Sequence, residues 1–148
     1  MRVLVFAAHA DDEVIAIGGT IRKLADQGAE IRLVTFSDGA EGYTRLEEKG
    51  TIVEQRRKEI GRVCRILGIR TNANLHGLDW NLRVDNAGYR AVMREIREFK
   101  PDLVFTHRRG DYNDHRAVHD VVTEGWFHAG VPCAMDLGPL WKHVPLYE

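Results

Sequence analysis

The chain has 148 residues, enough for one domain with a sizeable hydrophobic core, and its apolar fraction of 44% and charged fraction of 29% are ordinary for a globular protein. The formal net charge of −1 gives no reason to expect nucleic acid or an anionic membrane as a partner. Two cysteines are too few for a disulfide framework, and the first residues lack the pattern of a signal peptide, so we expect a cytoplasmic protein.

The apolar pattern alternates between strand and helix along the chain. Short β-branched and apolar runs predict five strands, at residues 2–8, 30–36, 72–78, 102–107 and 143–148. Helical spacing of apolar residues predicts four helices, at residues 12–27, 51–67, 86–99 and within 111–127. A polar loop with several glycines, residues 37–50, follows the second strand, and loops of this length are often functional.

Strands that alternate with helices of this length are typical of βαβ crossovers, which place helices on both faces of a parallel sheet. We therefore predict a single α/β domain over residues 1–148, Rossmann-like and doubly wound, with a mostly parallel sheet in the strand order 3-2-1-4-5. In such a sheet, ligands bind outside the carboxyl ends of the strands where the strand order reverses. The polar segments "HADDE" (residues 9–13) and "THRRGDYNDH" (residues 106–115) follow the first and fourth strands, so this order brings them together.

These two segments contain the donors of a metal site. His9 and Asp12 flank the turn from the first strand into the first helix, and His115 can supply a third ligand. Two histidines and one carboxylate, with one position open for water, form a ligand set typical of catalytic zinc. Asp11 would then face the water as general base. The alternative is that Asp11 and Asp12 are ordinary acids at a helix N-terminus, where unpaired N–H groups and the dipole favour them.

The segments "AHADDEV" and "DYNDHRAV" resemble the PIG-L/LmbE family of zinc-dependent N-deacetylases, and the likeness extends to "SDGAEGYTR", "EQRRKEIGRVCRILGI" and "PDLVFTH". The resemblance implies that His9, Asp12 and His115 bind zinc and that Asp11 is the base. It also implies that Arg56, in the helix after the long loop, reaches the substrate. The alternative for Arg56 is a solvated charge on an exposed helical face.

The chain departs from the family pattern at two positions. Ala10 replaces the usual proline, which only stiffens the turn. Tyr112 stands where the family often has a histidine that assists the tetrahedral intermediate. Either Tyr112 donates a hydrogen bond to the developing oxyanion, or Asp11 moves the proton alone. Asp114 is expected both to orient neighbouring groups and to cap its helix.

Other residues at the same sheet edge carry weaker predictions. His107 ends the fourth strand and is expected to orient a ligand or to contact substrate. Asp79 follows the third strand as a turn-forming acid, and Trp80 is expected to be a half-buried aromatic, with a sugar-stacking platform as the alternative. From Gly125 onward the chain is rich in large apolar groups, which either fill the core or form a self-association surface.

Taken together, these features predict a zinc-dependent hydrolase that removes an N-acetyl group from an amino sugar or glycoside such as an N-acetylglucosamine derivative. Another divalent transition metal can replace zinc in this ligand set. Family members usually continue further, so we expect a domain without the usual C-terminal extension, and a homo-oligomer is one way to complete the pocket. A catalytically inactive metal-binding or assembly subunit is the alternative. A phosphoesterase would need more carboxylates, and a dinucleotide-binding module would need G-x-G-x-x-G after the first strand.

Overall fold

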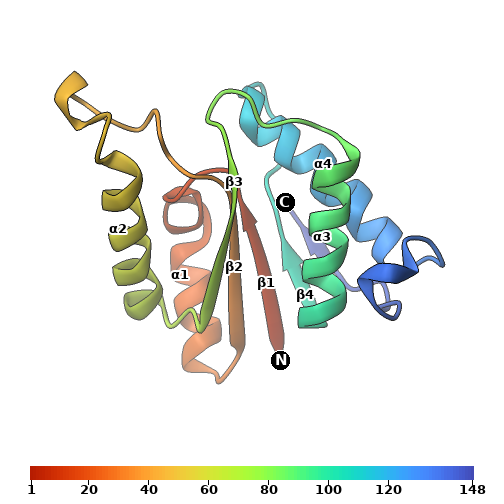
Figure 1. Ribbon diagram of the computed structural model, residues 1–148. Coiled ribbons are helices and arrows are strands. Elements are labelled where there is room, and N and C mark those ends of the chain that lie inside the picture. The colour runs from red at the N-terminus through yellow and green to blue at the C-terminus, as the bar shows by residue number, and fades with distance from the viewer.

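A five-stranded parallel sheet forms the centre of the molecule in the computed structural model, which describes residues 1–148 (Figure 1). The strand order is β3-β2-β1-β4-β5, as predicted, and every neighbouring pair is parallel. The strands are β1 (Arg2–Ala7), β2 (Glu30–Ser37), β3 (Thr71–Gly77), β4 (Leu103–Phe105) and β5 (Leu146–Tyr147). The fourth and fifth strands are shorter than the apolar runs that predicted them, because only two residue pairs join β4 to β5.

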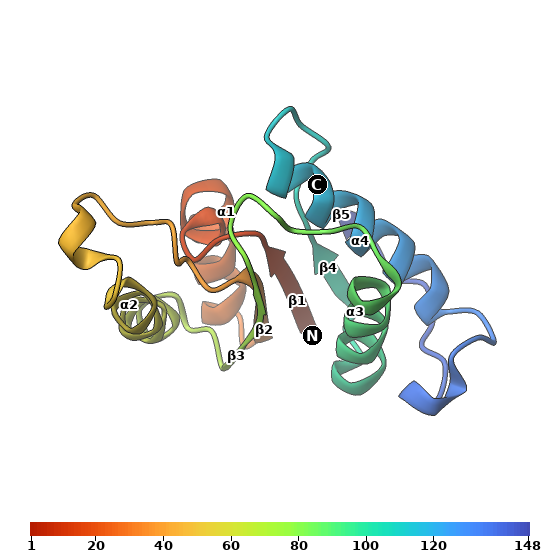
Figure 2. The ribbon, with the colours of Figure 1, turned by 45° about the horizontal axis from the view of Figure 1, so that its top comes forward.

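Four helices cover the sheet, two on each face (Figure 2). They are α1 (Asp12–Asp26), α2 (Ile52–Leu67), α3 (Asn86–Phe99) and α4 (Asn113–Ala129). Two short 3-10 helices, Leu46–Glu48 and Met135–Leu137, lie in the connecting loops. The predicted helix boundaries agree to within a few residues, but α1 is interrupted at Ile17, whose φ of −137° and ψ of 17° are not helical. No helix combines the length and the apolar composition needed to cross a bilayer.

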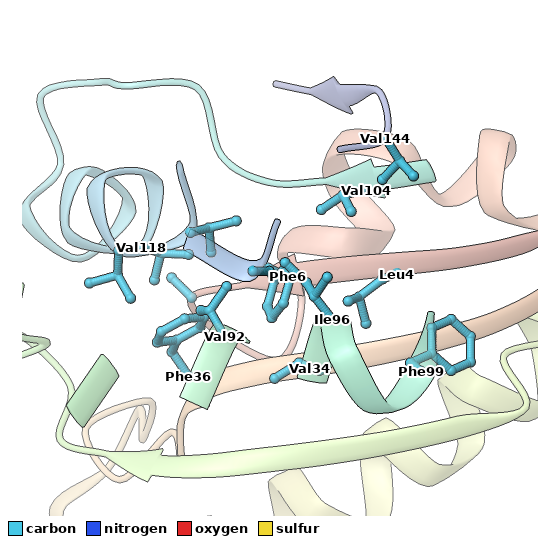
Figure 3. Packing of buried hydrophobic residues seen from close by; sticks show 14 residues of the cluster. Leu4, Phe6, Val34, Phe36, Val92, Ile96, Phe99, Val104, Val118 and Val144 are labelled. Atoms are coloured by element: carbon cyan, nitrogen blue, oxygen red, sulfur yellow. The ribbon is translucent and has the colours of Figure 1, made fainter. Parts of the chain in front are cut away.

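The hydrophobic core lies on both faces of β1 and β2, because successive side chains of a strand point to opposite faces. Leu4 and Phe6 face α3 and α4 in the larger cluster (Figure 3), whereas Val3 and Val5 face α1 and α2 in the smaller one. These four side chains are at most 2% exposed. A continuous apolar run, rather than an alternating one, is therefore the correct signature of β1.

Close contact between α3 and α4 depends on a glycine. A Cβ atom at Gly125 would lie 2.7 Å from side-chain atoms of Val92, so no larger residue fits without a shift of the helices. The buried Arg97 of α3, which is 1% exposed, holds the end of α4 and the segment that follows it. It donates hydrogen bonds to the backbone carbonyls of His128, Ala129, Val131, Cys133 and Ala134.

The pairing of β1 with β4 determines where the polar segments meet. Val5 pairs with Phe105 in this register, so the residues after both strands emerge at the same edge of the sheet. Only four residues separate the end of β1 from the start of α1. Because α4 begins at Asn113, its first turn lies at this edge as well.

Candidate functional site

The predicted metal ligands come together in the structure. His9, Asp12 and His115 each offer one ligand atom, and these atoms lie within 4.8 Å of one another. Nε2 of His115 is 3.1 Å from Oδ1 of Asp12, and Nδ1 of His9 is 3.5 Å from Oδ2 of the same carboxylate. The three residues come from the β1–α1 turn, the start of α1 and the first turn of α4.

A local hydrogen bond shapes the turn that carries two of these ligands. Oδ2 of Asp12 accepts a hydrogen bond of 2.8 Å from the backbone N–H of His9, which closes the turn. Asp11 occupies the N-cap position of α1, but its side chain makes no capping hydrogen bond. The carboxylate of Asp11 therefore stays free, contrary to the reading of this acid as an ordinary cap.

Asp114 contacts His9, and it does not cap α4. Its side chain is completely buried, and Oδ2 lies 3.1 Å from Nε2 of His9 and accepts a 2.7 Å hydrogen bond from the backbone N–H of Trp80. The N-cap of α4 is Tyr112, so the capping half of the prediction was wrong. Since Nε2 of His9 faces Asp114, Nδ1 is the nitrogen left for a metal ion.

The carboxylates of Asp12 and Asp114 dominate the electrostatics of the cluster. Burial favours neutral His9, but the hydrogen bonds and charges of Asp12 and Asp114 outweigh it and raise the pKa of His9 to about 9. Burial also opposes ionisation of Asp12, yet its contacts with His107 and His9 hold its pKa well below the usual range. Burial lowers the pKa of His115, which favours the neutral imidazole that a metal requires. Two imidazoles and an ionised carboxylate fit a divalent transition metal.

Asp11, Arg56 and Tyr112 line one cavity of about 350 Å³ beside these ligands. The guanidinium of Arg56 is held by Oε2 of Glu59 at 2.7 Å and by the carbonyl of Gly42 at 2.8 Å. Its side chain passes so close to the loop after β2 that a Cβ atom at Gly39 would lie 3.1 Å from it. Arg56 is thus fixed at the cavity wall and is not a free surface charge.

His107 lies behind the ligands and does not line that cavity. Its Nε2 atom is 3.1 Å from Oδ2 of Asp12 and accepts a 3.0 Å hydrogen bond from the backbone N–H of Ala8. Its ring stacks on His115 with the centroids 4.0 Å apart. Of the two predicted roles, this position favours orientation of a ligand over contact with substrate.

Glu13, the last acid of the "HADDE" segment, points into the interior. It is 2% exposed, and neither carboxylate oxygen has a hydrogen-bond partner. Burial raises the pKa of Glu13 to about 7. This acid is therefore separate from the metal ligands, although it adjoins Asp12 in the sequence.

The segment after β3 contributes more to the cavity than the sequence indicated. Trp80 is 68% exposed and lines the cavity, so the expectation of a half-buried aromatic was wrong. Oδ2 of Asp79 accepts a 2.7 Å hydrogen bond from the backbone N–H of Glu41 and thereby joins this segment to the loop after β2. Their position directly after a strand at the same sheet edge was the signal that could have identified both residues.

The chain is similar in sequence and fold to several known proteins. The chain is 29% identical to 1D-myo-inositol 2-acetamido-2-deoxy-α-D-glucopyranoside deacetylase of Thermobifida fusca, over 99% of this chain and 60% of that protein. The solved structure of N,N′-diacetylchitobiose deacetylase from Pyrococcus horikoshii matches with a TM-score of 0.90 and 28% identity, over 97% of this chain and 57% of that chain. The 4-carboxy-2-hydroxymuconate hydratase GalB from Pseudomonas putida KT2440 matches with a TM-score of 0.83 and 26% identity, over 97% and 61%.

The chain thus spans between 57% and 61% of the length of these three relatives. A family model described as GlcNAc-PI de-N-acetylase matches residues 4–126, which include every predicted site residue. With most of its length matched and with both polar segments meeting at one sheet edge, the chain belongs to the PIG-L family.

Proposed function

We propose that this protein is a metal-dependent hydrolase that removes the N-acetyl group from an N-acetylglucosamine derivative. One observation carries the proposal: the carboxylate of Asp11 makes no capping hydrogen bond, and Asp11 lines the same cavity as His9 and Asp12. Together with His115, those two residues supply the three donors of the proposed metal site. A free carboxylate beside such a site is the arrangement that hydrolysis of an amide requires, because the attacking water must lose a proton.

The metal ion would be held by His9, Asp12 and His115, and we propose zinc. When bound, it supplies Lewis acidity, which polarises the acyl oxygen and acidifies a nearby water molecule. Asp114 and His107 keep their ligands oriented through the contacts described above.

The remaining steps belong to the side chains of the cavity. Asp11 accepts the proton of the attacking water and returns it to the nitrogen of the departing amine. The hydroxyl of Tyr112 donates a hydrogen bond to the acyl oxygen as negative charge develops there. Arg56, held in place by Glu59 and Gly42, donates hydrogen bonds to hydroxyl groups of the sugar.

The substrate class rests on the names of the relatives, two of which are deacetylases of N-acetylated sugars. The partner in this proposal is a small glycoside, and neither nucleic acid nor a membrane takes part. GalB supports a second candidate, because a hydratase shares this fold at 26% identity. Addition of water to a carbon–carbon double bond would use the same base and the same metal site but would release no amine.

The test is an amine-release assay on zinc-loaded protein with N-acetylglucosamine and N,N′-diacetylchitobiose, with zinc content measured in parallel. We expect stoichiometric zinc and a free amine from at least one sugar. His9→Ala should lose both zinc and activity, whereas His128→Ala, whose imidazole contacts Glu124 on the surface of α4, should keep both. Bound zinc without amine release from either sugar would favour the hydratase or an inactive subunit.

A further inference from the structure

Trp80 combines two features that folding alone does not explain. Its φ of +63° lies in the left-handed region, which a bulky side chain rarely adopts. Its indole is also 68% exposed, although burial of an aromatic ring is favourable. Glycine would adopt this positive φ without strain, and a polar side chain would be better solvated at an exposed position. Strained residues of this kind are concentrated at functional sites.

Two contacts from the start of α4 hold Trp80 in this conformation. Its backbone N–H donates to Oδ2 of Asp114 at 2.7 Å, and its carbonyl accepts from Nδ2 of Asn113 at 3.5 Å. In Figure 1 the segment between β3 and α3 arches over the sheet edge past the beginning of α4. Because the same Asp114 oxygen contacts His9, the backbone of Trp80 is tied to the position of a proposed metal ligand.

The indole of Trp80 lies at the cavity that contains Asp11, together with two other exposed side chains. Ile15 is 79% exposed and Tyr112 is 46% exposed, and both line this cavity. Arg56 and Asp79 supply polar groups to the lining of the same cavity. One cavity therefore combines apolar surface with hydrogen-bonding groups, as a sugar with polar edges and an apolar ring face requires.

The other two tryptophans are different. The indole N–H of Trp126 donates to the carbonyl of Val144, and that of Trp141 donates to the carbonyl of Pro101. Both rings are partly buried against the larger hydrophobic cluster. The side chain of Trp80 has a hydrogen bond with the neighbouring Tyr112, but the residue is 68% exposed, so much of its indole surface is available to a ligand.

We propose that Trp80 is a stacking platform for a second ring, attached to the N-acetylated sugar, and that it selects glycosides and disaccharides over the free monosaccharide. The inference deepens the proposed function and rests on it, since it assumes that the acyl amide lies at the metal site. The ring presents an apolar face to the indole, and the contact adds affinity that a single sugar ring cannot obtain.

The experiment measures equilibrium binding to zinc-loaded Asp11→Asn protein, which keeps the cavity but not the proposed base. Calorimetric titration with N,N′-diacetylchitobiose and with N-acetylglucosamine gives the ratio of the two affinities. Trp80→Gly should weaken disaccharide binding roughly three- to tenfold and leave monosaccharide binding nearly unchanged. Trp80→Phe should restore most of the difference. Trp126→Phe is the matched control and should leave the ratio as it was.

Tryptophan fluorescence gives a second readout. Disaccharide binding should change the emission of the parent protein, and Trp80→Gly should remove that change while Trp126 and Trp141 remain. Trp80→Gly should also keep or raise the melting temperature, because glycine relieves the positive φ. An affinity ratio unchanged by Trp80→Gly would overturn this inference and leave the proposed function in place. Failure of the parent to bind either sugar would overturn both.

Discussion

The buried carboxylate of Asp114 lies 3.1 Å from Nε2 of His9, so a residue of α4 determines which nitrogen of a β1–α1 imidazole faces the metal site. Asp114→Asn keeps the shape and can still accept the hydrogen bond from Trp80, but it loses the charge that supports His9. We expect zinc affinity to fall by roughly 10- to 100-fold. Competition with a chromophoric chelator measures this fall.

Asp120→Asn is the matched control for this prediction. Asp120 lies on the same helix and also contacts an imidazole, with Oδ1 2.8 Å from Nδ1 of His119, but it is remote from the three ligands. Its variant should bind zinc like the parent. Equal affinities in the Asp114 and Asp120 variants would show that Asp114 does not support the metal site.

Asp11→Asn should abolish turnover without loss of the metal or of stability. Asparagine is as good an N-cap as aspartate, and the Asp11 side chain makes no capping hydrogen bond, so the free energy of unfolding should not change. We expect kcat to fall by about 10²- to 10⁴-fold, because the base is lost. Steady-state amine release and zinc analysis check this, with Asp26→Asn at the other end of α1 as the control. Normal rates in the Asp11 variant would rule out its role as base.

Tyr112→Phe distinguishes the two proton schemes. Burial raises the pKa of Tyr112, so its hydroxyl stays protonated at neutral pH and can donate. The phenylalanine ring would keep the edge contact with His115, whose centroid is 4.8 Å away. If the hydroxyl stabilises the oxyanion, kcat should fall about 10²- to 10³-fold with little change in KM. An unchanged kcat would mean that Asp11 acts alone.

Arg97→Met should destabilise the protein, although Arg97 does not line the cavity. The carbonyl of Cys133 would lose its Arg97 donor, while the other four carbonyls that Arg97 contacts each keep a backbone N–H donor. A buried carbonyl left without a donor costs about 1–3 kcal/mol. We expect a loss of roughly 1–3 kcal/mol in the free energy of unfolding, measured by urea titration. Arg94→Met, at an exposed position on the same helix, should change it by about 0.5 kcal/mol or less.

Cys64 should resist alkylation in the folded protein. Burial, together with the charge of Glu13, raises the pKa of its thiol to about 11. The folded chain therefore keeps a proton that an unfolded thiol, with a pKa of about 8.5, releases. Stability linked to Cys64 is fully present below the unfolded pKa and is lost as the pH rises toward 11.

Mass spectrometry after iodoacetamide treatment at pH 8 tests this expectation. Label should reach the half-exposed Cys133 first, and Cys64 only after unfolding in urea. Cys64→Ala should flatten the decline of stability between about pH 8.5 and 11. Rapid labelling of Cys64 in folded protein would contradict its burial.

The strand order and the meeting of His9, Asp12 and His115 were both predictable from the sequence. Long buried runs and helical spacing identify βαβ units, and the rules for such units leave few places where strand-end polar residues can meet. Every strand of the sheet is parallel, which the prediction of a mostly parallel sheet anticipated. The cytoplasmic location and the single-domain boundaries stay predictions.

The contacts between loops were not predictable in the same way. The sequence predicts Asp114 as an N-cap because acids are common near helix starts, yet the helix begins two residues earlier than such a cap would require, and the Asp114 side chain is buried. No periodic pattern in the sequence indicates that the backbone of Trp80 adopts a left-handed conformation. Arg97 lies in a charged helix, and its partners are carbonyls at the end of α4 and in the loop that follows, which has no repeating pattern. Such contacts depend on backbone conformations that residue spacing does not encode.

The two halves of the proposed metal site are synthesised at very different times. Asp12 lies near the first residues of the chain, whereas His115 lies 103 positions later, in the helix that follows β4. When only β1 and α1 of a nascent chain have left the ribosome, two of the three donors are present. The third follows after β4, the strand that pairs with β1. An ion at the proposed site would therefore find its complete set of ligands only once β4 and the start of α4 are in place.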